Sequence, residues 1–156
     1  MSGSGKLGFW TKAAMIAAVY ALLAIVLAPI SYGMIQVRVA EALTILPYFT
    51  PAAIPGLFAG CMLANLYGGN GILDIVCGSL ATLLAAYLTS RIKNRVLVPL
   101  PPVLINALVV GYVLHLVLGY SLYLTMLWVG AGQVAACYGL GYPLLLLLDK
   151  HHHLFN

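Results

Sequence analysis

Long apolar runs, separated by short polar or glycine- and proline-rich connections, make up almost the whole chain. Pro29 ends the first run, a glycine-rich stretch over 68–71 follows the third, and a cluster of prolines begins the fifth. The pattern predicts helices over 11–28, 39–48, 51–67, 74–91, 99–119 and 122–148. Since a helix needs about 20 residues to cross the hydrocarbon core, we expect an all-α integral membrane protein with about six transmembrane helices.

The composition supports a membrane protein with little chain outside the bilayer. Hydrophobic residues are 63% of the 156 and charged residues are 6%, whereas roughly a quarter of a soluble domain is charged. We predict an N-terminal tail over 1–10, a membrane domain over 11–148 and a polar tail over 149–156. The first five residues, MSGSG, are typical of a sequence that an expression vector adds to the N-terminus.

The basic residues predict the orientation of the chain. With about six spans, one face receives Lys6 and Lys12, the segment 91–95 and Lys150, while Arg38 falls on the other. Basic loops stay on the cytoplasmic side, so both termini should be cytoplasmic. The net charge of +4 is spread along the chain and forms no patch, so nucleic acid is not an expected partner.

Two acidic residues within the apolar region are the first candidates for a binding site, because an ionisable group at membrane depth is costly. Glu41 lies three residues after Arg38, so the two either form a local ion pair or contact a polar ligand. Asp74 begins a predicted helix, where it serves either as the N-cap or as a ligand contact.

Amides and aromatic residues are further candidates. Asn65, Asn70, Asn106 and Gln133 need partners in hydrocarbon, and either interhelical hydrogen bonds or a ligand would satisfy them. Small residues precede Gln133 and leave space beside it. Trp128 either stacks on a flat ligand or belongs to an interfacial aromatic belt.

Ala13, Ala17 and Ala21 recur at every fourth position of the first helix, as do Ala14 and Ala18. Such a stripe allows close helix approach, either inside the bundle or with a partner protein. The sequence contains no pairing of a nucleophile with a base, no metal-ligand spacing and no nucleotide-binding motif. We therefore expect a protein that is not an enzyme and has neither a metal nor a cofactor.

Several long segments resemble the QueT family. They are ISYGMIQVRVAEALT (30–44), TPAAIPGLF (50–58), ANLYGG (64–69), DIVCGSLATL (74–83) and LPPVLINA (100–107). The resemblance implies a substrate-binding (S) component of an energy-coupling factor (ECF) transporter in a prokaryotic cell membrane. Its expected partners are a transmembrane coupling protein and two cytosolic ATPases, with Ala13, Ala17 and Ala21 as the docking face.

The resemblance also implies a substrate: a queuosine precursor of the 7-deazaguanine type. Glu41 is the expected acceptor for adjacent N–H donors of such a base. Asn106 and Gln133 would serve its carbonyl edge, and Asp74 an aminomethyl group. Arg38, Asn70 and Trp128 complete the predicted site. The alternative function is that of a stand-alone secondary carrier or channel for a small polar solute.

Overall fold

The first helix is longer than its apolar run. A computed structural model describes residues 3–31, 37–69 and 71–151 of the chain. Helix α1 (Gly3–Val26) includes much of the segment predicted to be a tail, although Gly3, Gly5 and Gly8 in that segment disfavour a helix. After a turn at Leu27 the chain continues as the short helix α2 (Ala28–Ser31), in which Pro29 occupies a position that tolerates a missing N–H.

The second predicted helix has the expected bounds but a tighter winding. It is the 3-10 helix η1 (Val39–Tyr48), with Pro47 inside it. A 3-10 helix of this length is uncommon, because its hydrogen-bond geometry is poorer than that of an α-helix. Helix α3 (Ala53–Gly68) follows, and Gly69 ends it with a φ of 65°, which favours glycine.

The fourth and sixth predicted helices each contain a π-helical segment. The fourth consists of η2 (Asp74–Gly78) and α4 (Ser79–Thr89). The sixth consists of α6 (Leu122–Val134), η4 (Ala135–Gly141) and α7 (Tyr142–Lys150). Between them lie the short η3 (Arg95–Leu97) and α5 (Leu100–Leu118). The π-segments are a finding that hydrophobic periodicity does not reveal, and such segments are frequent at functional sites.

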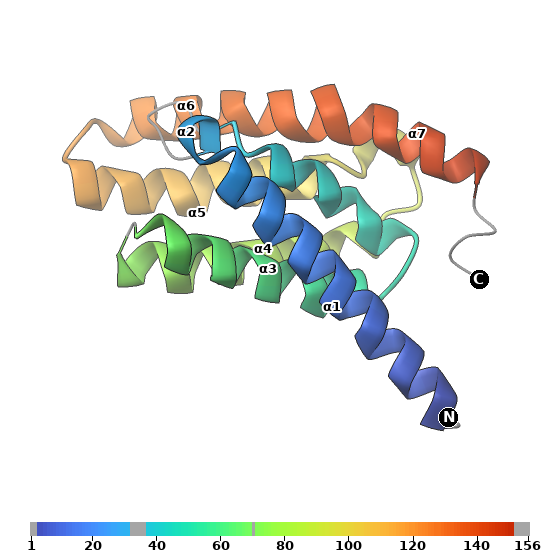
Figure 1. Cartoon of the computed structure of the whole chain (residues 1–156). Helices are drawn as coiled ribbons and strands as arrows, with labels where there is room; N and C mark the ends of the chain where they lie inside the picture. The colour runs from blue at the N-terminus through green and yellow to red at the C-terminus, as the bar shows by residue number, and fades with distance from the viewer. Residues whose placement is uncertain (1–2, 32–36, 70, 152–156) are drawn as a thin grey trace.

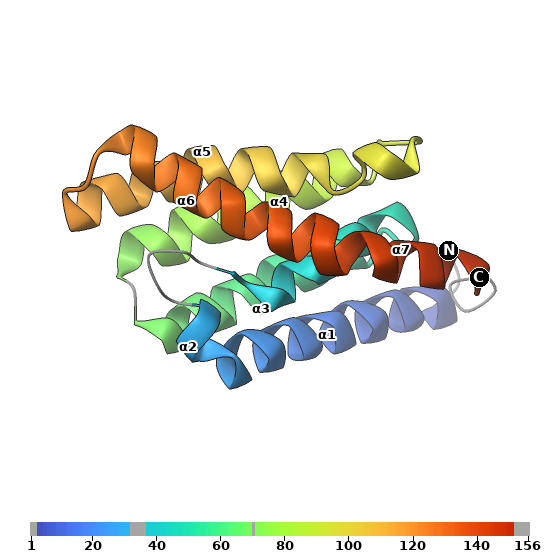
Figure 2. The same cartoon turned by 90° about the horizontal axis from the view of Figure 1, so that it is seen from above.

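The elements run back and forth between two ends of the bundle (Figures 1 and 2). Both termini and the connection between α4 and α5 lie at one end. Helix α2, the connection from α3 to η2 and the turn from α5 to α6 lie at the other. The segments that contain most of the lysine and arginine residues therefore lie at one end of the molecule, as the sequence predicts.

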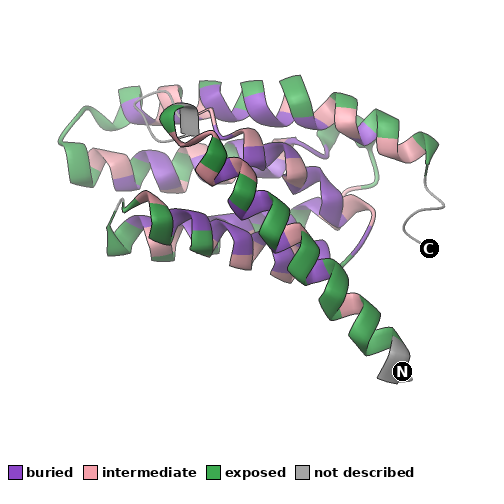
Figure 3. Cartoon of the chain, viewed as in Figure 1, coloured by how far each residue is buried: buried purple, intermediate pink, exposed green. Residues whose placement is uncertain are grey.

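Helices α1 and α3 pack at backbone distance. A Cβ added at Gly56 would lie 2.7 Å from the carbonyl oxygen of Ala13, and one added at Gly60 would lie 2.8 Å from that of Ala17. Only glycine at these two positions allows α1 to lie this close. Buried positions gather on the inward faces of the helices, and exposed ones cover the outside (Figure 3).

Three helical stretches are long and apolar enough to cross a membrane: Gly5–Val26, Arg95–Leu118 and Leu122–Lys150. Val39–Tyr48, Ala53–Gly68 and Asp74–Thr89 are shorter apolar helices. Leucine, valine and tyrosine side chains are exposed along the long helices, as expected for surfaces that face lipid. The described chain is therefore all-helical and suited to a membrane.

Candidate functional site

The interior of the bundle contains charged and amide side chains within an otherwise apolar core. Glu41 is 0% exposed, and Arg38 and Asp74 are each 4% exposed. Because such burial is costly without partners, these groups mark a candidate site. The site has two parts, which we call the Glu41 group (Tyr20, Glu41 and Asn106) and the Arg38 group (Arg38, Asn65 and Asp74).

In the Glu41 group, both carboxylate oxygens accept hydrogen bonds from other helices. The Tyr20 hydroxyl on α1 donates to Oε1, and the Asn106 amide on α5 donates to Oε2 over 3.3 Å. The amide oxygen of Asn106 is buried and has no hydrogen-bond partner among the described residues. Since a carboxylate accepts only from donors, its presence fixes the amide nitrogen toward Glu41 and leaves Oδ1 as an acceptor.

The role expected for Asn106 at the carbonyl edge of a base stays a prediction. That role requires a donor, and the hydrogen bond to Glu41 uses one of the two N–H groups of the Asn106 amide. Its remaining oxygen is an acceptor, as is the carboxylate beside it. The Glu41 group therefore offers acceptors to a ligand and matches an edge that carries N–H groups.

The Arg38 group joins the start of η1 to α3 and η2. The Arg38 guanidinium donates to the amide oxygen of Asn65, and its Nη2 lies 3.7 Å from Oδ2 of Asp74. The Asn65 amide then donates to the backbone carbonyl of Asp74 over 3.1 Å. The ion pair that the structure describes for Arg38 is thus with Asp74, on a distant element, rather than with Glu41, three residues away.

Asp74 is not the N-cap of its helix, which was one of the two roles expected for it. The N-cap of η2 is Leu73, and Asp74 lies in the first turn of that helix. Its carboxylate instead reaches Arg38 across the bundle. A Cβ at Gly78 would lie 3.3 Å from Oδ1 of Asp74 and 3.0 Å from Nδ2 of Asn65, so this glycine leaves room for the Arg38 group.

Gln133 is connected to the backbone of Glu41 through the side chain of Cys137. Its amide oxygen lies 3.5 Å from Sγ of Cys137, which lies 3.6 Å from the backbone carbonyl of Glu41. Thr44 donates to that carbonyl over 2.6 Å. The structure thus brings Gln133, on α6, to the backbone of η1 rather than into direct contact with the carboxylate.

Two other predicted residues lie apart from these contacts. Trp128 is half-buried and packs edge-on against Tyr120, with ring centroids 5.9 Å apart, near the turn between α5 and α6. This position fits both the aromatic belt and the ligand contact that the sequence left open. Asn70 lies outside the described residues.

The alanine stripe of α1 is largely covered by the chain itself. Ala13, Ala17 and Ala21 are buried, and the carbonyls of the first two face the glycines of α3. This is the internal packing that the sequence allowed as one explanation of the stripe. Docking of a partner on these residues stays a prediction. The exposed side of α1 carries the second stripe, Ala14 and Ala18.

Sequence reasoning did not select Tyr20 for the site. The available signal was a tyrosine in the middle of an apolar helix, because a buried hydroxyl needs a partner. Cys61 and Thr82 were also missed. The Thr82 hydroxyl lies 3.3 Å from Sγ of Cys61, and that sulfur lies 3.5 Å from the amide nitrogen of Asn65 in the Arg38 group. Distant pairs of this kind leave no local pattern in a sequence.

The arrangement is suited to binding a polar molecule. The described site residues include two acids and one arginine, so ionisation of all three side chains would leave one net negative charge. A ligand with several N–H groups or a cationic group would compensate that charge. Within the described residues, no three His, Cys, Asp or Glu side chains gather closely enough to hold a metal ion.

Comparison with known proteins identifies the family. The family model described as QueT transporter matches residues 10–150. The chain belongs to the QueT transporter family. It is also similar to a protein of Lactococcus lactis subsp. cremoris (strain MG1363) described as queuosine precursor transporter QueT, with 38% identity over 72 residues. That alignment covers 45% of the chain and 42% of the relative, so the chain spans less than half of the relative's length. No solved structure matches the chain.

Proposed function

We propose that this chain is the substrate-capturing membrane subunit of an ATP-driven ECF importer for queuosine precursors of the 7-deazaguanine type. Family membership and the name of the similar Lactococcus protein support transport of such a precursor. The resemblance of the sequence supports the ECF mechanism. The chain would cross a prokaryotic cell membrane about six times, with both termini in the cytoplasm.

The observation that carries the proposal is the buried Glu41 carboxylate beside the Asn106 amide oxygen, which has no hydrogen-bond partner in the described part of the chain. A guanine-type base presents a ring N–H and an exocyclic amino group side by side, and both are donors. A carboxylate accepts such a pair with charge-assisted hydrogen bonds, and a neighbouring amide oxygen accepts a further one. Adenine lacks this row of donors, so it should bind poorly.

An aminomethyl group on the precursor would also fit the charge of the site. Asp74 was expected to meet such a group, but its carboxylate already lies beside Arg38. Glu41 is the acid of the site that lies outside this ion pair. A cationic aminomethyl group would therefore be stabilised by the net negative charge of the site as a whole rather than by Asp74 alone.

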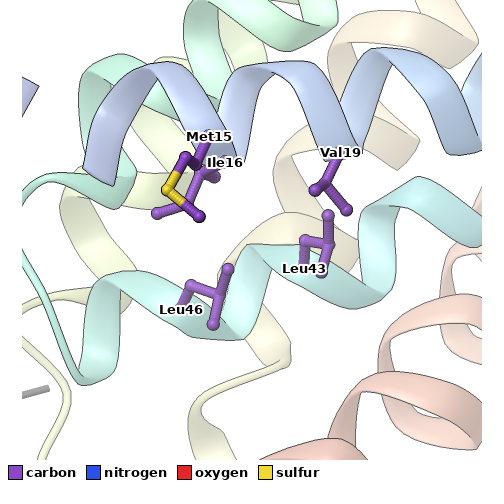
Figure 4. A pocket seen from close by; sticks show the side chains of 5 residues that line it. All are labelled: Met15, Ile16, Val19, Leu43 and Leu46. Carbon is purple, nitrogen blue, oxygen red and sulfur yellow. The ribbon is translucent and has the colours of Figure 1, made fainter. Parts of the chain in front are cut away.

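The proposed partner would approach the exposed side of α1. An apolar groove lies between α1 and η1, lined by Met15, Ile16, Val19, Leu43 and Leu46 (Figure 4). It adjoins the exposed stripe of Ala14 and Ala18 on the same helix. Small side chains next to an apolar groove permit the close helix packing that membrane partners use. The coupling protein would contact this side, and the two ATPases would bind to it in the cytoplasm.

Titration calorimetry of the purified protein tests the substrate. We expect 7-deazaguanine to bind and adenine to bind much more weakly. Glu41→Gln should weaken 7-deazaguanine binding about ten- to hundredfold, because the amide loses an acceptor and opposes a donor with its own N–H groups. Binding of 7-deazaguanine by Glu41→Gln with the parent's affinity would refute the site. No binding by the parent would refute the substrate class.

A further inference from the structure

We propose that Tyr20 is a positioning residue that orients the Glu41 carboxylate for the ligand and makes ligand affinity depend on how α1 is seated against α3. This inference rests on the proposed function, because it concerns how the same site is held ready. Tyr20 would act through Glu41 and would not itself need to touch the ligand.

The carboxylate is held from two opposite elements. Tyr20 on α1 donates to Oε1, and Asn106 on α5 donates to Oε2. Each carboxylate oxygen can accept more than one hydrogen bond, so both remain able to accept from a ligand. With Tyr20 absent, Glu41 would be held at one oxygen only and its plane could rotate about that contact.

The position of the Tyr20 hydroxyl is set by the contact between α1 and α3. Tyr20 is 1% exposed, and a Cβ at Gly60 would lie 2.8 Å from the Tyr20 Cβ. A tyrosine has only two side-chain torsions, so a displacement of its backbone carries the hydroxyl with it. A shift of about 1 Å would take the hydroxyl out of hydrogen-bond range of Glu41.

This geometry connects the helix proposed for partner docking to the residue proposed for ligand binding. Ala17 and Tyr20 are both on α1, and both lie against Gly60. Any partner that moved α1 away from α3 would loosen the Tyr20–Glu41 hydrogen bond and lower ligand affinity. Release of the ligand on docking would follow from this one contact.

A double-mutant cycle separates positioning from simple packing. Tyr20→Phe keeps the ring and removes the hydroxyl. By titration with 7-deazaguanine, it should weaken binding about tenfold in the parent and change affinity little in a Glu41→Gln background. Tyr123→Phe is the matched control, because Tyr123 is an exposed tyrosine, and it should bind like the parent. Equal losses in both backgrounds would overturn the proposal.

Gly60→Ala tests whether the packing of α1 against α3 affects ligand affinity through Tyr20. In folded protein it should weaken 7-deazaguanine binding when Tyr20 is present, with little further effect in a Tyr20→Phe background. An equal loss in both backgrounds would contradict the link between helix seating and the hydroxyl. Melting curves of each variant identify the folded protein on which affinities are measured.

Infrared difference spectra of the ligand-free protein provide a readout that needs no substrate. The Glu41 carboxylate band, assigned by its loss in Glu41→Gln, should shift in Tyr20→Phe and stay in place in Tyr123→Phe. An unshifted band would overturn the role of Tyr20. If the parent fails to bind 7-deazaguanine, the proposed function and the ligand part of this inference both fall. If the parent and Tyr20→Phe bind equally, the inference falls alone.

Discussion

At the scale of single residues, the sequence identifies which charges need explanation but not how they are paired. Glu41, Arg38 and Asp74 are conspicuous because the chain has so few charged residues. The pair that forms is Arg38 with Asp74, from elements distant in the sequence. Sequence spacing suggested a pair of Arg38 with Glu41 as one of two alternatives, because it shows only which residues share a helical turn. The binding role of all three residues stays a prediction.

The Arg38 pair leads to a stability prediction. Removing one member of a buried ion pair leaves the other charge uncompensated, at a cost of about 3–5 kcal/mol. We therefore expect Arg38→Gln and Asp74→Asn each to lower the melting temperature strongly. The double variant Arg38→Gln/Asp74→Asn should lose less stability than the sum of the losses of the two single variants.

Melting curves of the detergent-solubilised protein measure this coupling. Lys93→Gln is a suitable control, because Lys93 is an exposed basic residue of the connection between α4 and α5 and should melt like the parent. Strictly additive losses of Arg38→Gln and Asp74→Asn would argue against a direct interaction between the two charges.

At the scale of elements, apolar runs and their prolines and glycines predict most helices. The bounds of η1, the end of α5 before Gly119 and the start of α6 at Leu122 agree with the expected ones. The winding does not follow from the pattern. Apolar periodicity does not distinguish an α-helix from a 3-10 or π segment, because the difference lies in hydrogen bonds one residue apart.

Packing of α1 on α3 predicts opposite effects for neighbouring alanines. Ala17→Trp places an indole where α3 approaches at backbone distance, so overpacking should cost more than about 3 kcal/mol and prevent stable folding. Ala18→Trp places the same side chain on the exposed side of α1 and should leave the fold and 7-deazaguanine binding intact.

The same pair of variants tests partner docking. If the coupling protein contacts the exposed side of α1, Ala18→Trp should abolish co-purification with it while ligand binding persists. A melting temperature of Ala17→Trp equal to the parent's would contradict the packing argument. Undiminished co-purification of Ala18→Trp would exclude the exposed stripe as the docking surface.

At the scale of the whole molecule, the alternating direction of the elements and the placement of the basic segments agree with each other. Both termini and the basic connection over 91–95 lie at one end of the bundle (Figure 1). The turn between α5 and α6 lies at the opposite end (Figure 2). The sequence predicts this through the distribution of lysine and arginine, because charge distribution reports topology even where helix lengths are ambiguous.

Single-cysteine labelling tests that topology. In a background lacking Cys61, Cys77 and Cys137, Lys93→Cys and Lys150→Cys should react with a membrane-impermeant maleimide only after the cells are opened. Tyr123→Cys, near the opposite end, should react in intact cells, because that position is exposed. Labelling of Lys93→Cys and Lys150→Cys from different sides would refute the number and orientation of spans.

The source of energy distinguishes the two functions that the sequence allowed. In the described residues, Arg38 and Asp74 are paired with each other and Glu41 is held between Tyr20 and Asn106, within one buried region. A proton relay instead needs titratable groups that continue across the membrane. We therefore expect 7-deazaguanine uptake to require the coupling protein, both ATPases and ATP on the cytoplasmic side. Proteoliposomes with this chain alone and an imposed pH gradient should bind the base but accumulate none. Accumulation there would identify a secondary carrier, and the ATP-driven importer would have to be abandoned even if Glu41 proved to be the binding residue.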